Sequence, residues 1–173
     1  MKRLPILALV VAAGCAGTAK EVEESRSLMT SDGHASFVLP AGWQGAGKGE
    51  ATQEWQLLRG EAVVATLEVI FIADYADFFR RPDDLAYMVG KDDPTREYEV
   101  VAAGKTGTQG GPAVTVRYRM GHGATSVTGT NLFVLTPEGA VQFKLVYWMG
   151  EPAQDVESEG EGILSSVRVL EIQ

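Results

Sequence analysis

Residues 62–72 read AVVATLEVIFI, an apolar run interrupted only by Thr66 and Glu68. A run of this kind, rich in β-branched residues and free of Gly and Pro, is typical of a strand inside a sheet. We therefore expect it to lie in the centre of a β-sheet. Arg59–Gly60–Glu61, directly before it, has the composition of a tight turn, so Trp55–Leu58 is expected to pair with it as a hairpin.

The rest of the chain carries further strand signals. Alternation of apolar and polar residues, the two-residue period of a strand, is clear in Val114, Val116 and Tyr118. A glycine-rich loop is expected between the first strand and the hairpin, at Ala41–Ala51. Outside the hairpin, the expected strands are Ser36–Leu39, Tyr98–Ala103, Ala113–Met120, Thr128–Leu135, Val141–Met149 and Val167–Ile172.

Two segments have helical patterns. Within Asp74–Gly90, Pro82 followed by Asp83 and Asp84 is typical of a first helical turn, where carboxylates meet the positive end of the helix dipole. Pro152 opens a last helix, and its apolar face is expected to consist of Val156, Gly160, Ile163 and Leu164. The order of elements predicts an α+β fold, a single antiparallel sheet of about six or seven strands covered by two helices.

Three motifs resemble those of a known family. The segment from Ser36 to Trp43, SFVLPAGW, resembles the F-x-x-P-x-G-W opening of the PsbP-like superfamily, which includes the bacterial DcrB-like lipoproteins. Gly110-Gly111-Pro112-Ala113 resembles that family's turn into a central strand, and Ser165-Ser166-Val167 resembles its closing segment. The resemblance covers about Ala35 to Leu170. It implies a PsbP-like fold and a role in binding proteins or supporting assemblies, but fold likeness does not transfer function by itself.

The first residues have the parts of an export signal. Lys2 and Arg3 give a positive start, and the apolar run Leu4–Ala13 is too short to span a bilayer as a helix. The segment from Ala12 to Cys15 resembles a bacterial lipobox, with Ala12 in the usual leucine position. The resemblance implies that residues 1–14 are a lipoprotein signal peptide and that Cys15 becomes a lipidated N-terminus.

The mature chain is expected to have two parts. Residues 15–34 are polar and are interpreted as the lipidated cysteine and a flexible tether, and residues 35–173 as one domain. Because Ala16 is not aspartate, the rule for inner-membrane retention is not met, so an outer-membrane anchor facing the periplasm is expected. Two alternatives are secretion with cleavage after Ala19, and burial of residues 4–13 as a core strand.

Charge and cysteine content limit the partners. The formal net charge is −8, so the chain repels nucleic-acid backbones and we expect no nucleic-acid partner. Cys15 is the only cysteine, which excludes an internal disulfide framework.

No cofactor or metal is expected. His34 and His122 are the only histidines and are interpreted as surface loop residues outside any metal cluster. Residues 42–49 resemble a phosphate-binding loop but have Gly49 in place of the hydroxyl that binds magnesium. With no nucleophile activated by a neighbouring base in view, the sequence predicts that the protein is not an enzyme.

A group of aromatic residues next to arginines is the candidate partner-binding surface, because these residue types dominate interface energies. The alternative is that the rings pack the first helix against the sheet. The hypothesis is a non-catalytic protein-binding or assembly-support domain, and the alternative is a small-ligand-binding or hydrolytic envelope protein using a groove between helix and sheet. The proposed surface consists of Tyr75, Phe78, Phe79, Arg80 and Arg81.

Overall fold

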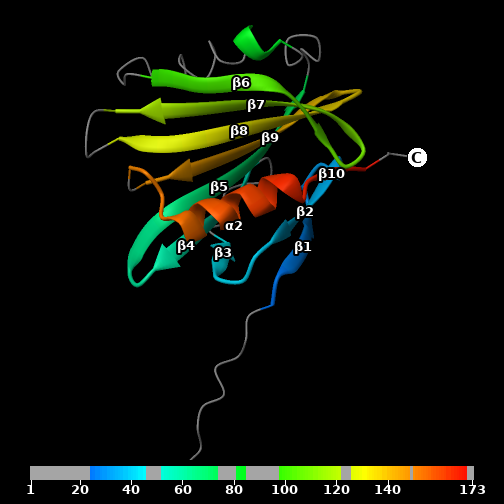
Figure 1. The fold of residues 1–173 in the computed structure, drawn as a ribbon. Coiled ribbons are helices and arrows are strands. Elements are labelled where there is room, and N and C mark those ends of the chain that lie inside the picture. The colour runs from blue at the N-terminus through cyan, green and yellow to red at the C-terminus, as the bar shows by residue number, and fades with distance from the viewer. Residues whose placement is uncertain are drawn as a thin grey trace, which may run out of the picture.

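The large sheet has seven antiparallel strands. The computed structural model describes residues 24–45, 52–73, 81–84, 98–121, 126–148 and 150–170. The strand order is β3-β4-β5-β9-β8-β7-β6, and the helix α2 lies across one face (Figure 1). The elements are β3 (Trp43–Gly45), β4 (Thr52–Arg59), β5 (Ala62–Ala73), β6 (Tyr98–Thr108), β7 (Gly111–Met120), β8 (Val127–Thr136), β9 (Gly139–Tyr147) and α2 (Gln154–Ser165).

A second, three-stranded sheet stands at one end of the large one (Figure 1). It consists of β1 (Arg26–Met29), β2 (Ala35–Leu39) and β10 (Arg168–Val169), in the order β1-β2-β10. The expectation of a single sheet is therefore wrong. The chain turns at Pro40 and Gly42, so that β2 pairs with the two ends of the described chain while β3 joins the large sheet through β4.

The predicted strands are found, and two more appear. The run at 62–72 is β5, an interior strand, while β9 holds the middle of the order. Trp43–Gly45 was expected in a loop and is a strand, because Trp43 pairs with Leu57. Arg26–Met29 was expected in the flexible tether and is also a strand, because its backbone pairs with β2 from Arg26↔Leu39 to Met29↔Ser36.

The hydrophobic core between the large sheet, α2 and β2 is built around packed rings. Phe37 of β2 meets Trp55 and Phe143 edge to face, with ring centroids 5.3 Å and 5.4 Å away. A second apolar cluster lies on the other face of β7, β8 and β9. Along β7, Val114, Val116 and Tyr118 belong to this second cluster, so the intervening residues point toward the side that carries α2.

α2 packs closely on the sheet. Of the predicted apolar face, Val156, Gly160 and Ile163 are buried, and Leu164 is half-buried against the same core. A Cβ at Gly160 would overlap the Tyr147 hydroxyl and Leu145 of β9, so only glycine permits this close approach. Pro82–Asp84 are helical, as predicted, and the rest of the predicted first helix lies outside the described residues.

Candidate functional site

α2 lies on the β5 and β9 side of the large sheet and leaves β6, β7 and β8 uncovered on the same face (Figure 1). The space beside the helix forms two adjoining hollows of about 380 and 320 Å³. We call these hollows the α2 groove. Their shared lining is Arg117, Thr130 and Tyr147.

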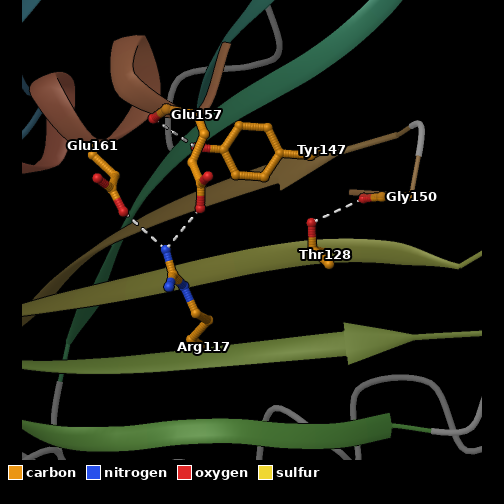
Figure 2. A network of polar contacts seen from close by, with 6 residues as sticks. All are labelled: Arg117, Thr128, Tyr147, Gly150, Glu157 and Glu161. Atoms are coloured by element: carbon orange, nitrogen blue, oxygen red, sulfur yellow. Dashed lines mark hydrogen bonds and ion pairs between the residues drawn. The ribbon is translucent and has the colours of Figure 1, made fainter. Parts of the chain in front are cut away.

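Arg117 of β7 links α2, which forms the wall of the α2 groove, to the sheet, which forms its floor. Its Nη2 donates to Glu157 Oε1 at 3.2 Å and to Glu161 Oε1 at 2.9 Å (Figure 2). The two glutamates are four residues apart, so they point from the same side of α2. Arg117 remains 46% exposed, which means that its charge is available at the surface of the groove.

A second arginine holds the other side of α2. Arg59, beside the β4–β5 turn, lies 3.5 Å from Asp155 and 2.8 Å from Glu159. Exposed ion pairs contribute little individually. Together with the close contact at Gly160, however, the two arginines fix the helix across its width and make it a rigid wall.

Tyr147 closes the bottom of the α2 groove. Its hydroxyl donates to the carbonyl oxygen of Glu157 at 3.4 Å (Figure 2). Burial raises the pKa of Tyr147 well above its ordinary value, and the charges of Glu157 and Glu161 raise it further, against a smaller lowering by Arg117. Tyr147 is therefore a neutral hydrogen-bonding group at physiological pH.

Small and hydroxyl side chains form the floor. Ala102, Thr115 and Thr130 line the larger hollow. At the smaller hollow, Thr128 Oγ1 donates to the carbonyl oxygen of Gly150 at 3.1 Å, which fixes the connection between β9 and α2 (Figure 2).

Val101 is the exposed apolar residue at the rim. It lines the smaller hollow, with 52% of its surface exposed, where a break in the β6–β7 register occurs between Val100 and Ala102. A mixed surface of this kind, with an apolar contact, hydroxyl groups and an arginine, is suited to recognition.

The structure describes only some of the residues that the sequence predicts as site residues. Cys15 and His122 lie outside the described residues, as do four members of the proposed aromatic surface, Tyr75, Phe78, Phe79 and Arg80. Arg81 is described: its guanidinium is exposed and lies 3.5 Å from Asp84.

His34 is not a surface residue, contrary to the sequence interpretation. It is 5% exposed, its ring stacks on Phe71 with centroids 4.9 Å apart, and its Nε2 lies 3.5 Å from Glu138. The flanking Gly33 suggested an exposed turn. The turn instead packs against the end of β5, so the imidazole is buried.

The residues of the α2 groove were not singled out from the sequence. Alternation along β7 does place Arg117 on the face opposite Val116 and Tyr118, and the spacing of Glu157 and Glu161 puts both on one helix side. Their contact joins positions 40 and 44 residues apart, which neither pattern reveals.

The described residues hold no group of three or more histidine, cysteine or acidic side chains placed to bind a metal ion. No helix within them has the length and apolar character needed to cross a membrane.

The architecture is a PsbP-like fold, as the sequence motifs implied. Cyanobacterial PsbP (CyanoP) from Synechocystis sp. PCC 6803 has a TM-score of 0.65 and 18% identity over 91% of this chain and 99% of its own. The Ran-binding protein Mog1p of Saccharomyces cerevisiae has a TM-score of 0.61 and 12% identity over 85% of this chain and 96% of its own. No protein-family model and no curated protein matches the sequence. At these identities the likeness establishes the fold, and function has to be argued from the site.

Proposed function

We propose that this protein is a membrane-anchored envelope lipoprotein, held by lipid on Cys15, whose folded domain binds a protein partner without catalysing a reaction. The positive start, short apolar run and lipobox-like segment of residues 1–15 support the anchor. Under this proposal the domain faces the periplasm from the outer membrane.

The observation that carries the binding role is the α2 groove. The charged groups between its two hollows are paired: Arg117 holds Glu157 and Glu161, and burial keeps Tyr147 protonated. Paired charges and a neutral phenol are poor proton acceptors, whereas they make good hydrogen-bonding contacts for another protein. Mog1p, which shares the fold, is a Ran-binding protein, so the scaffold is compatible with binding proteins.

The test is to fill the groove. Ala102 lies on its floor, and the next residue, Ala103, is also exposed but points to the other face of the sheet. Ala102→Tyr should abolish co-purification of the partner from crosslinked envelopes, and Ala103→Tyr should preserve it. Thermal melting of both variants checks that the fold is intact. Equal recovery of the partner with the two variants would contradict the proposal.

A small-ligand role is the alternative, and a third hollow favours it. This hollow, of about 390 Å³, lies at the start of α2 and has Val64, Pro152 and Val156 in its lining. Apolar walls with a few polar groups are typical of ligand pockets. A screen of apolar small molecules by thermal shift decides the matter, since a hit that is lost in Val64→Trp and retained in Ala102→Tyr would assign binding to this hollow.

A further inference from the structure

The three-stranded sheet β1-β2-β10 has one buried face and one exposed face. Alternate residues of β2, from Ala35 to Leu39, are buried in the core, so Ser36 and Val38 between them point outward. Their cross-strand partners point the same way, because directly paired residues share a face of the sheet. We call this surface the small-sheet face. Its residues are Ser27, Met29, Ser36, Val38 and Arg168.

Two apolar side chains of the small-sheet face are open to solvent. Met29 is 59% exposed and Val38 is 41% exposed, whereas Leu28, on the other side of β1, packs against the core. Val38 lies directly opposite Ser27 and diagonally from Met29, so the two apolar side chains are neighbours. Exposed apolar side chains that lie together, rather than singly, indicate a contact surface.

Of the five residues of the small-sheet face, only Arg168 is charged. It is exposed and pairs with Ser36 on the side away from Met29. The acidic character of the chain is carried elsewhere; α2, for example, holds four acidic residues between Asp155 and Glu161. An arginine beside apolar and hydroxyl side chains suits a phospholipid surface, because the guanidinium forms two hydrogen bonds to a phosphate while its stem stays in the apolar layer.

The start of β1 limits how far the small-sheet face lies from the proposed anchor. Residues 15–34 were expected to hold the lipid and the tether, but β1 begins at Arg26, so ten residues, 16–25, separate Cys15 from the sheet. Even when fully extended, they keep Arg26 within about 40 Å of Cys15. Met29 follows about 10 Å further along β1. In the described chain, this face is therefore the first exposed apolar surface after the anchor.

We propose that the small-sheet face rests on the phospholipid surface that holds the lipid of Cys15. Met29 and Val38 reach the boundary between headgroups and acyl chains, and Arg168 binds a lipid phosphate. The inference rests on the lipid anchor of the proposed function. Two apolar side chains are too few to hold a free domain on a bilayer, because such binding scales with the buried apolar area. A tethered domain needs far less, since the tether keeps its effective concentration at the surface high.

This contact would orient the domain on the membrane. In Figure 1, β1 lies near the lower end of the molecule and β6 at its upper end, with α2 between them. The α2 groove lies beside β6 and α2, so a domain that rests on the small-sheet face leaves the groove accessible to a partner.

The test uses the lipidated full-length protein inserted into preformed phosphatidylcholine vesicles, which carry no net charge to repel an acidic chain. Met29→Cys gives the small-sheet face a free thiol for the dye NBD, and lipid blocks Cys15, the only native cysteine. Val101→Cys on β6 is the matched control, an apolar position with 52% exposure. We expect dithionite, which stays in water, to reduce NBD at Met29→Cys at least about three-fold more slowly than at Val101→Cys.

A second substitution tests whether the apolar contact causes this protection. Val38→Asp, made in the labelled Met29→Cys protein, should abolish the difference, because a carboxylate resists burial at the lipid boundary. Val38 is exposed, so the melting temperature should stay the same. Protection that persists in Val38→Asp would overturn the proposal.

Vesicle flotation separates this inference from the anchor on which it depends. If the protein does not float with the vesicles, the lipid anchor itself is wrong and the inference fails with it. If the protein floats but dithionite reduces both probes at the same rate, the anchor stands and the small-sheet face does not contact lipid. Protection at Met29→Cys that grows with the amount of protein per lipid would instead assign the face to a second copy of this chain.

Discussion

Trp43 is the residue whose truncation we expect to cost the fold most. It is 1% exposed, and its carbonyl oxygen accepts a hydrogen bond from Arg26 at 2.6 Å. Trp43→Ala should lower the free energy of unfolding by about 3–5 kcal/mol in urea titrations.

Trp43→Phe is the control variant for this prediction. Within the described part of the chain this buried nitrogen makes no hydrogen bond, so Trp43→Phe forfeits volume but no polar partner. We expect Trp43→Phe to lose clearly less than Trp43→Ala. A Trp43→Ala loss below about 1 kcal/mol would mean that the ring contributes little to the core.

Ionisation of Tyr147 is expected to lower the stability of the folded state at alkaline pH. Its folded pKa lies above the unfolded value of about 10, so above pH 10 the unfolded chain releases this proton while the folded chain keeps it. Stability contributed by this group is complete below pH 10 and falls as pH rises above it, by roughly 1 kcal/mol at pH 11.

The comparison with Tyr147→Phe isolates this effect. Urea unfolding at pH 8 and pH 11 should show a smaller alkaline loss for Tyr147→Phe than for the wild type, because the other tyrosines titrate alike in both. If the two proteins lose the same stability, then Tyr147 ionises equally in the folded and unfolded states.

At the scale of elements, the contact of α2 with β9 depends on Gly160. Alanine normally favours a helix over glycine by up to about 1 kcal/mol. At Gly160 the added methyl group meets the Tyr147 hydroxyl and Leu145, so Gly160→Ala should destabilise the protein. At Gly162 a Cβ has open space, and Gly162→Ala should stabilise it by about 0.5–1 kcal/mol.

Thermal melting of Gly160→Ala and Gly162→Ala measures the expected loss of stability in the first and the expected gain in the second. A double variant with Tyr147→Phe should recover part of the loss at Gly160, because it removes the hydroxyl that the methyl group meets. If both alanine variants are stabilised, the helix shifts freely on the sheet and does not form a rigid wall of the α2 groove.

Whether a strand could be predicted from the sequence depends on how that strand is stabilised. β5, β7, β8 and β9 carry long apolar or alternating runs, so their own sequences predict them. β1 and β3 are short and depend on pairing with distant backbone, which no local pattern contains. The same limit applies to the candidate site, since Arg117 and Glu161 meet only after α2 packs on the sheet.

At the scale of the whole molecule, the seven-stranded sheet separates two surfaces. α2 and the α2 groove occupy one face, and the second apolar cluster lies on the other. Under the proposed function the partner approaches the face that carries α2, so Ala102→Tyr should remove it from the crosslinked proteins and Ala103→Tyr should not.

The last prediction concerns the anchor. Cys15→Ser removes the thiol that receives the lipid, so the protein should move from the membrane pellet to the soluble fraction of lysed cells. The described domain begins after this position, so the variant should keep its melting temperature.

Anchoring should still matter for the partner in cells. A tether concentrates the domain near the membrane, so Cys15→Ser should reduce crosslinking to a membrane-bound partner although the α2 groove is intact. Cys15→Ala is the matched variant, because it removes the same thiol without adding a hydroxyl. If either variant stays in the pellet in the same amount as the wild type, lipid on Cys15 does not anchor this protein.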